Sequence, residues 1–441
     1  MNYSSIMKAC VIAAPMSGSG KTTVTIGLLS ALRSRGLQVQ AFKVGPDFID
    51  TGLHALATGR PSHNLDGWML SRETNLELFA GAAAGKDVAV VEGVMGLFDG
   101  ASGSSNSGST AEMAGWLGLP VILVIDAHVL ARSVAAIVHG FQTFDPSLQI
   151  AGVILNRVAG EGHFRLLADA LKDVRILGWL PDDPEIRIAE RHLGLLTAGE
   201  IAAQERVERI GSFFASHVDV DRILDALPQG KGTAVNCVND IKGTKKVRVA
   251  LAVDAAFSFY YQANRTALEN CGAEIVEFSP LRDAGLPDAD FLYIGGGYPE
   301  LYRSELERNR SMRQTIRRFI ESGKRFYAEC GGLMYLSKSI DGSEMVGILP
   351  TDIHLTDRLV DFGYCDITTR QASIFGPADT AIRGHQFHYS KATTAAPDPV
   401  YNVKQRTREY AEGWLLPNGI ASYVHLHFLS NPSIVRHMLA W

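Results

Sequence analysis

The segment CVIAAPMSGSGKTT, residues 10–23, constrains the fold of this chain more than any other. An apolar run leads into a loop of small residues, and a lysine and a threonine then open a stretch compatible with a helix. Backbone N–H groups of such a loop and of the following helix N-terminus can surround phosphate oxygens. The segment departs from the pattern G-x-x-x-x-G-K-[ST] in having Pro15 where a glycine is expected. It predicts a strand, a phosphate-binding loop and a helix within an α/β domain that binds ATP.

Within this segment, Lys21 is expected to reach the outer phosphates of ATP, and the Thr22 hydroxyl is expected to hold Mg²⁺. The glycines allow the tight turn, although Pro15 replaces the first one. The residues predicted to contact ATP here are Ser17, Gly18, Gly20, Lys21, Thr22 and Thr23.

The chain has two series of predicted strands. From residue 7 to about 220, short apolar runs alternate with helical stretches, which is typical of a parallel sheet with helices on both faces. Residues 228–246 are polar and have no helical or strand period, so they are interpreted as a linker. A second series of strands follows. We therefore predict an α/β protein with an ATP-dependent domain over 1–227, a linker over 228–246 and a second domain over 247–441.

Composition limits the classes of partner. The formal net charge is −5 and there is no block of lysines and arginines, so nucleic acid and membrane surfaces are not expected as partners. No apolar run approaches the roughly 20 residues of a membrane span, and the N-terminus lacks the features of a signal peptide. The chain is predicted to be cytoplasmic and to act on small molecules, in an oligomeric state that the sequence does not indicate.

The cysteines do not form a disulfide framework. There are five, at wide spacing and without a C-x-x-C pair. Cys10, in the first predicted strand, and Cys271, near a helix end, are interpreted as core residues, because free cysteine packs as a small hydrophobic side chain.

Charged residues follow other predicted strands of the first half. Lys43 and Asp47 are predicted to lie just after the second strand, and Glu92 just after the third. In open α/β sheets, ligands bind at the carboxyl ends of the strands. Mg²⁺ beside a triphosphate prefers one or two protein carboxylates together with phosphate oxygens and water. Asp47 and Glu92 are therefore predicted to join Thr22 as metal ligands, and Lys43 and Asp47 are candidates for contact with the substrate carboxylate.

In the second half, the segment RFYAECGGLMYL places Cys330 between a predicted strand and a predicted helix. A turn of this kind exposes the side chain at the edge of the sheet and directs a helix N-terminus toward it, which favours the thiolate. The turn YIGGGYPE, at another strand end, can bring backbone N–H groups of Gly296 or Gly297 close to an oxyanion, because no Cβ intervenes. Cys330 is the predicted nucleophile.

Six motifs together resemble those of a known family. They are KVGPDFIDTGLH, VVEGVMGLFDG, DAAFSFYYQAN, YIGGGYPEL, the ECGG turn and RGHQFHYS. They resemble successive signatures of the cobyrinic acid a,c-diamide synthases, and the resemblance covers both halves. It implies an N-terminal P-loop NTPase domain similar to dethiobiotin synthetase and a flavodoxin-like, class I glutamine amidotransferase domain at the C-terminus.

The resemblance also implies an activity. The family comprises carbon–nitrogen ligases that amidate the a and c acetate side chains of a corrin precursor in cobalamin biosynthesis, with glutamine, ATP and Mg²⁺. Cys330 would then release ammonia from glutamine. The substrate could be cobyrinic acid, metal-free hydrogenobyrinic acid or a nickel tetrapyrrole.

Further residues take roles from the resemblance. The family pattern places the general base at His425 rather than at His427, and Asn156 resembles a residue that reads the adenine ring. In most class I amidotransferases a glutamate two positions after the base orients it. Here that position is His427, so the expected triad is reduced to the pair Cys330 and His425.

Other functions are less consistent with the motifs. A partition ATPase would carry a signature lysine where Met16 stands, and it would have no cysteine turn. A non-catalytic tetrapyrrole-binding regulator would not need Lys21 and Cys330 intact. A zinc site built from His385, His388, His425 and His427 would lack acidic or cysteine ligands at a familiar spacing.

Overall fold

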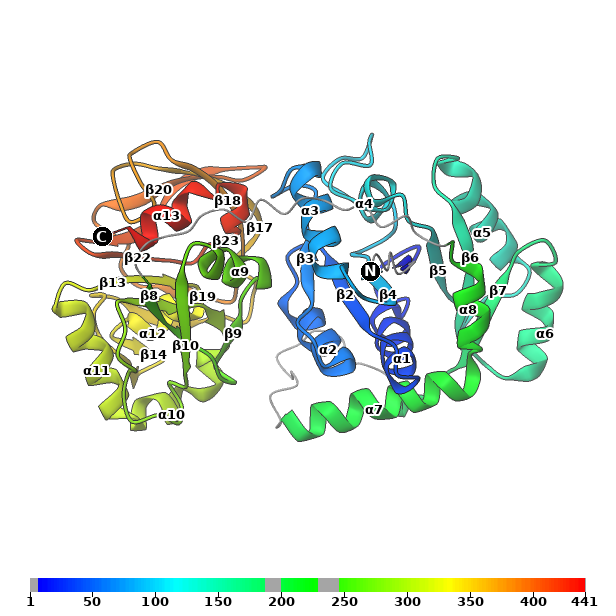
Figure 1. Ribbon diagram of the computed structural model, residues 1–441, viewed down its shortest axis with the longest axis horizontal. Helices are drawn as coiled ribbons and strands as arrows, with labels where there is room; N and C mark the ends of the chain where they lie inside the picture. The colour runs from blue at the N-terminus through cyan, green and yellow to red at the C-terminus, as the bar shows by residue number, and fades with distance from the viewer. Residues whose placement is uncertain (1–6, 187–199, 229–245, 441) are drawn as a thin grey trace, which may run out of the picture. The chain divides into compact units, whose positions relative to one another are not determined.

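The computed structural model describes residues 7–186, 200–228 and 246–440, and the chain divides into two compact units, Met1–Cys237 and Val238–Trp441 (Figure 1). The division falls within 228–246, the predicted linker. Residues 229–245 of that linker, Cys237 among them, lie outside the described residues, so the linker and the domain bounds stay predictions.

The first unit contains a parallel sheet in its described part. Seven strands lie in the order β3-β2-β4-β1-β5-β6-β7, and every neighbouring pair is parallel. The strand β1 lies in the middle of the sheet, with β2, β3 and β4 on one side and β5, β6 and β7 on the other, as in doubly wound folds. The strands are β1 (Lys8–Ala13), β2 (Val39–Val44), β3 (His63–Leu65), β4 (Val88–Glu92), β5 (Val121–Asp126), β6 (Ile150–Val158) and β7 (Ile176–Pro181).

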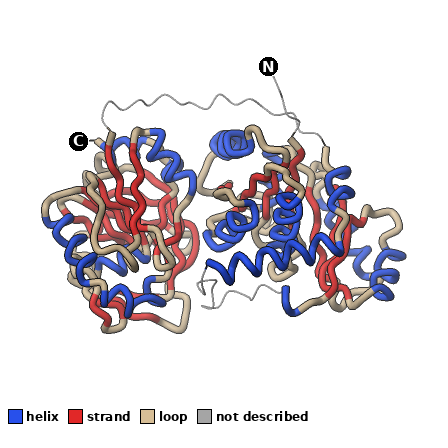
Figure 2. The backbone as a smooth tube through the Cα atoms, turned by 60° about the horizontal axis from the view of Figure 1, so that its bottom comes forward, coloured by secondary structure: helices blue, strands red, loops and turns tan. Residues whose placement is uncertain are grey.

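Helices cover both faces of this sheet, as Figure 2 shows with helices in blue and strands in red. The core on one face joins the strands to α1 (Lys21–Ser34), α2 (Phe48–Thr58), α7 (Glu200–His217) and α8 (Val220–Ala226). The core on the other face joins them to α3 (Arg72–Ala83), α4 (Thr110–Leu117), α5 (Ser133–Phe144) and α6 (Glu161–Ala170). A short 3-10 turn, Pro184–Ile186, follows β7. The predicted α/β class with helices on both faces is confirmed.

Two strands of this sheet, β3 and β7, were not predicted. β3 has three residues and pairs only with β2 in the described sheet. Glu92 is therefore the last residue of the fourth strand in chain order and does not follow the third, and Lys43 lies within β2 rather than after it. The sequence HNL of β3 is too short to show an alternating pattern, which is why the periodicity did not reveal it.

The phosphate loop has the predicted local structure. β1 ends at Ala13 and α1 begins at Lys21, and the loop between them contains Gly18 and Gly20, with φ of 78° and 92°. A Cβ at Gly20 would lie 2.1 Å from Asn156 Nδ2. Gly20 is therefore required both for the left-handed turn and for the close approach of β6.

The second unit is built on a mixed sheet of ten strands in the described residues, in the order β10-β8-β11-β13-β22-β21-β20-β17-β18-β23. The neighbours from β10 to β22 are parallel, and the remaining neighbours are antiparallel. The strands are β8 (Val247–Ala252), β10 (Ala273–Phe278), β11 (Phe291–Ile294), β13 (Arg325–Glu329), β17 (Asp361–Thr369), β18 (Ala381–His388), β20 (Pro399–Lys404), β21 (Glu409–Leu416), β22 (Gly419–Ser422) and β23 (His425–Leu426).

Smaller sheets and helices complete this unit. One core lies under α10 (Arg303–Arg308), α11 (Arg310–Glu321) and α12 (Gly331–Leu336), and the other under α9 (Gln262–Asn270) and α13 (Ser433–Leu439). Two 3-10 turns are Pro299–Tyr302 and Phe428–Ser430. The small sheets contain β9 (Phe257–Phe259) with β12 (Gly296–Gly297), and β14 (Ser339–Ile340), β15 (Ser343–Glu344), β16 (Asp352–Leu355) and β19 (Ser390–Ala392).

The late segment IASYVHLHF forms two strands rather than one. β22 pairs in parallel with β13, whereas β23 pairs antiparallel with β18. The chain must change direction between them, at Tyr423 and Val424. This turn brings His425 to the end of β13, where Cys330 lies.

In the part of the chain that the structure covers, no helix combines the length and the apolar character that a bilayer crossing requires.

Packing of α7 on α1 is expected to support the phosphate loop. Phe214 of α7 is 1% exposed, and a Cβ at Gly27 of α1 would lie 2.6 Å from its Cβ. Phe214→Ala should lower the stability of the first unit by about 3–5 kcal/mol, because a cavity would remain. Phe144→Ala, at a position 72% exposed, is the control and should change stability by no more than about 0.5 kcal/mol. Calorimetry of the full chain measures both; equal unfolding midpoints would contradict this packing account.

Candidate active sites

The carboxylate of Glu92 is the centre of a buried polar cluster at the carboxyl end of β4. Its Oε1 accepts hydrogen bonds from Thr22 Oγ1 at 2.7 Å and Lys43 Nζ at 2.9 Å. Its Oε2 lies 2.6 Å from His54 Nε2. Burial raises the pKa of Glu92, but Lys43 and His54 outweigh it and hold that pKa below its ordinary value. Glu92 is therefore an anion at neutral pH.

Lys43 connects Glu92 with a second carboxylate. Its Nζ lies 2.6 Å from Asp50 Oδ2. Burial lowers the pKa of Lys43, but Asp50, Glu92 and Asp47 raise it above the ordinary value. Lys43 is charged and held in place by two carboxylates.

The sequence did not identify Asp50 and His54 as site residues. Both lie in the motif KVGPDFIDTGLH, three and seven positions after Asp47. On a helix these spacings place side chains on one face, and α2 does begin at Phe48. Reading the helical period through the motif would have found them.

Asp47 is the N-cap residue of α2. Its Oδ1 accepts hydrogen bonds from the backbone N–H groups of Ile49 and Asp50, at 2.9 and 3.0 Å, and so caps α2. Capping of this kind typically contributes about 1 kcal/mol. Its predicted roles toward metal and substrate stay predictions.

The phosphate loop is held by contacts from three directions. Lys21 Nζ donates to the backbone oxygens of Met16 at 3.2 Å and Met95 at 2.5 Å. Asn156 Nδ2 donates to Ser19 O at 3.0 Å, and Arg157 donates to Gly18 O at 2.6 Å.

The other predicted ATP contacts lie on the same loop and helix. Ser17 and Gly18 are exposed, while Thr22 and Thr23 lie half-buried in the first turn of α1. Asn156 reaches this loop from β6, which the structure shows, but its predicted contact with adenine is untested.

The donors around Thr22 suit Mg²⁺. A hydroxyl and a carboxylate oxygen 2.7 Å apart are hard ligands at the edge of a phosphate loop. Over the described ranges, no group of three or more His, Cys, Asp and Glu side chains is placed to hold a metal ion. A cation here would thus depend on phosphate oxygens and water for most of its ligands.

In the second unit, Cys330 occupies the predicted turn between β13 and α12, with φ 45° and ψ −101°. A non-glycine residue with positive φ is strained, and such strain is common where a side chain must be presented for chemistry. A Cβ at Gly332 would lie 2.2 Å from Ile294 O, so α12 must begin with small residues.

The structure brings His425 to Cys330. Both side chains are buried, with exposed fractions of 5% for Cys330 and 2% for His425. Burial lowers the pKa of His425, but the hydrogen-bonded Cys330 and the neighbouring Glu329 raise it to about 10. His425 Nδ1 lies 3.4 Å from Glu329 Oε2. The arrangement favours an imidazolium at His425, next to the Cys330 side chain.

Gly296 and Gly297 border this pair. A Cβ at Gly296 would lie 2.2 Å from His425 Cε1, and one at Gly331 would lie 3.1 Å from the backbone nitrogen of Gly297. The imidazole thus packs directly on backbone, and the Gly297 nitrogen faces the turn that carries the thiol. The predicted oxyanion role of both glycines remains untested.

The remaining histidines of the cluster are uncharged. Burial lowers the pKa of His427 to about 3 and that of His388 to about 4, and it holds the pKa of His385 well below the ordinary value. His385 Nδ1 lies 2.8 Å from Tyr261 Oη, and His388 Nδ1 lies 2.9 Å from Ser390 O. They pack among aromatic side chains and offer no charged ligand set.

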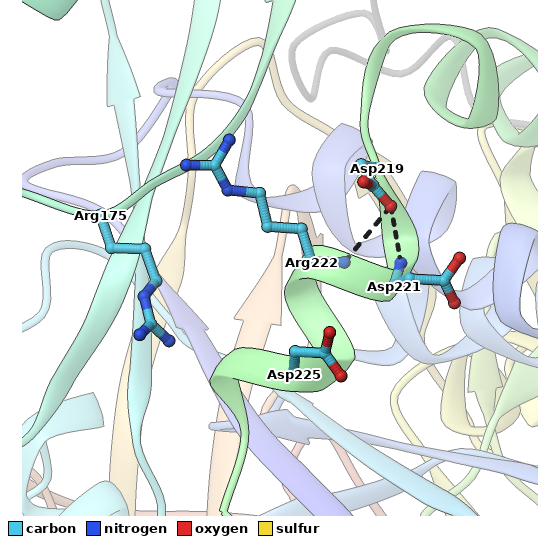
Figure 3. A pocket seen from close by; sticks show the side chains of 5 residues that line it. All are labelled: Arg175, Asp219, Asp221, Arg222 and Asp225. Carbon is cyan, nitrogen blue, oxygen red and sulfur yellow. Dashed lines mark hydrogen bonds between the residues drawn. The ribbon is translucent and has the colours of Figure 1, made fainter.

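A surface pocket of the first unit lies elsewhere (Figure 3). Arg175 precedes β7, at the amino edge of the sheet, whereas the loop and Glu92 lie at the carboxyl edge. None of the predicted site residues lines it; the lining side chains are Arg175, Asp219, Asp221, Arg222 and Asp225.

Family models match both halves of the chain. Residues 10–196 match the CobQ/CobB/MinD/ParA nucleotide binding domain, and residues 248–433 match the CobB/CobQ-like glutamine amidotransferase domain. A cobyrinate a,c-diamide synthase of Listeria monocytogenes serotype 4b is 45% identical over 449 residues, covering 98% of this chain and 99% of that protein. The chain belongs to the cobyrinate a,c-diamide synthase family.

A second relative and a solved structure were also compared with the chain. The cobyrinate a,c-diamide synthase of Salmonella typhimurium is 42% identical over 450 residues, with 98% of this chain and 97% of that protein covered. PurLQS from Thermotoga maritima matches with a TM-score of 0.35 and 15% identity, over 44% of this chain and 98% of that chain, which is too low to assign a fold. The predicted combination of a nucleotide-binding domain with a glutamine amidotransferase domain is confirmed by the family models.

The packing of His425 on Gly296 can be tested directly. Gly296→Ala should displace the imidazole and lower the rate of glutamine hydrolysis by about 10²-fold, since small misplacements at a reacting centre have effects of that size. Synthesis with ammonium as the donor should persist. The control is Gly285→Ala, whose Cβ would meet only Thr315, with its hydroxyl at 3.2 Å. Normal glutamine hydrolysis in Gly296→Ala would contradict this geometry.

Proposed function

We propose that the chain amidates the a and c acetate carboxylates of cobyrinic acid, using ATP and glutamine. One observation carries the proposal. A single chain, similar over almost its whole length to cobyrinate a,c-diamide synthases, contains a Thr22–Glu92–Lys43 cluster beside a phosphate loop and a buried Cys330–His425 pair. The first is suited to phosphoryl transfer and the second to nucleophilic attack on an amide.

Activation of the substrate is assigned to the first unit. A carboxylate is a poor electrophile, so its oxygen first attacks the γ-phosphorus of ATP, and ADP leaves with the electrons of the broken P–O bond. Lys21 and the loop backbone hold the outer phosphates. Thr22, Asp47 and Glu92 would hold Mg²⁺, which would neutralise phosphate charge when bound. Lys43 is placed to steady the substrate carboxylate, and Asn156 to contact the adenine ring.

Release of nitrogen is assigned to the second unit. The Cys330 thiolate attacks the side-chain amide carbon of glutamine, and Gly296 and Gly297 supply N–H donors to the oxyanion. Such a donor contributes on the order of 10²- to 10³-fold in rate. His425 gives its proton to the departing nitrogen, so that ammonia leaves and a glutamyl thioester remains. Water then hydrolyses the thioester to glutamate.

The two half-reactions join at the acyl phosphate. Ammonia attacks its carbonyl carbon, phosphate leaves, and the amide forms. Ammonium cannot attack, because it has no lone pair, so the nitrogen must reach the acyl phosphate unprotonated. The tetrapyrrole substrate could carry cobalt, nickel or no metal. Assays with each of these three polycarboxylates, in which the amides formed are counted by product mass, distinguish the three substrates.

The division of labour predicts opposite responses to ammonium. Cys330→Ala should abolish diamide formation with glutamine, and ammonium at alkaline pH should restore it, because free NH₃ bypasses the thiol. Lys21→Ala should be inactive with either donor, since no acyl phosphate would form. Product masses after each assay give the result, with circular dichroism as a folding check. A folded Cys330→Ala protein that ammonium does not rescue would refute the two-site proposal, and activity of Lys21→Ala would refute the role of the phosphate loop.

A further inference from the structure

We propose that Glu329, the residue before the thiol, is the positioning residue that orients His425. The inference rests on the proposed function of Cys330 and His425 and adds the member that their pair lacks. Two positions after His425, where the resemblance implies an orienting glutamate, the chain has His427. The carboxylate comes instead from the strand that carries the nucleophile.

The backbone brings Glu329 to this position. It is the last residue of β13 and pairs in register with Ser422, the last residue of β22. The chain turns after Ser422 and presents His425 three residues later. The two strand ends therefore place the carboxylate on one side of the imidazole, with Nδ1 and Oε2 3.4 Å apart. This contact is an ion pair without hydrogen-bond geometry, and catalytic hydrogen bonds are often long or poorly aligned before substrate binds.

Glu329 is buried, and removing a carboxylate from water costs free energy unless a partner compensates its charge. The exposed fraction of Glu329 is 2%, and its Oε1 accepts a hydrogen bond from Tyr293 Oη at 3.1 Å. Burial keeps the pKa of Tyr293 and Tyr327 well above their ordinary values, so neither carries charge. Across the described ranges, His425 is the one basic side chain that forms an ion pair with Glu329. A buried anion requires such a partner.

The other groups around His425 cannot replace the carboxylate. The ring of His385, from β18, stacks on that of His425 with centroids 5.0 Å apart, and its Nδ1 is bonded to Tyr261. The ring of His427 packs on Tyr261 at 4.6 Å. Both histidines are neutral, because burial lowers their pKa. His385 stacks on the imidazole without compensating its charge, whereas His427 packs on Tyr261.

A catalytic consequence follows from which nitrogen faces Glu329. With Nδ1 directed to the carboxylate, Nε2 is the nitrogen available to the Cys330 thiol and to the leaving ammonia. Glu329 fixes this orientation of the ring and stabilises the imidazolium that forms when His425 takes the thiol proton. Loss of the equivalent carboxylate in a Ser–His–Asp site lowers kcat by about 10⁴-fold.

The test compares two carboxylate-to-amide variants. Glu329→Gln should lower kcat for glutamine hydrolysis by about 10²- to 10⁴-fold, change KM for glutamine less than about threefold, and leave ammonium-dependent synthesis unchanged. Glu412→Gln is the matched control. Glu412 lies on the adjacent β21, contacts Ser422 and Tyr423 rather than His425, and has a pKa that burial raises to about 7. Its replacement should leave glutamine hydrolysis nearly unchanged.

The pH profile separates positioning from structural support. The titratable groups that interact with His425 are Glu329, Cys330, His385 and His388. Removing the Glu329 charge destabilises the imidazolium, so the alkaline limit of glutamine hydrolysis should move to lower pH in Glu329→Gln. A structural defect alone would lower the rate without moving that limit. An unchanged kcat or an unmoved alkaline limit would overturn the proposal.

A measurement on the unmodified chain covers the case in which Glu329→Gln does not fold. ¹⁵N resonances of the His425 ring, identified by their loss in His425→Asn, should show both nitrogens protonated at pH 8. A ring that is neutral at pH 8 would overturn the role of Glu329. If Cys330→Ala still hydrolysed glutamine, the proposed function would fail instead, so the two failures are distinguishable.

Discussion

The charge of Glu92 is the interaction on which the first unit's site depends. An anion removed from water is stable only when opposite charge and hydrogen bonds surround it. Here Lys43 comes from β2, His54 from α2 and Thr22 from the first turn of α1. Three consecutive elements, α1, β2 and α2, are therefore tied to the end of β4, through residues that lie 38 to 70 positions before Glu92. The same contacts set the distance between the phosphate loop and the groups expected to meet the substrate.

In the second unit, a strained backbone conformation positions the reactive side chain. Cys330 adopts a positive φ so that its thiol leaves the end of β13 toward His425. Because Gly296 has no Cβ, the imidazole of His425 can pack against its backbone. Because Gly332 has none, the start of α12 can lie close to the end of β11. The thiol, the base and the N–H groups of the glycine turn are all placed by the ends of strands.

Much of this arrangement could be predicted from the sequence, because the signals are local. The loop ending at Lys21, the turn at Cys330 and the strand ending at Glu92 each combine a period change with a distinctive residue. Asp50 and His54 were missed, since their roles depend on which face of α2 meets β4. The role now inferred for Glu329 was also missed. Its neighbour in the sequence is the nucleophile, but its partner His425 is reached only through the pairing of β13 with β22 and the turn that follows.

The central claim is that a substrate carboxylate becomes an acyl phosphate before nitrogen arrives. Cobyrinic acid labelled with ¹⁸O in its a and c carboxylates tests this most directly, with glutamine and ATP present and the released phosphate and nucleotide analysed by mass. The account predicts one ¹⁸O atom in inorganic phosphate for each amide formed, because the carboxylate oxygen leaves with the phosphoryl group. Amide formation with unlabelled phosphate, or with the label in AMP, would contradict it.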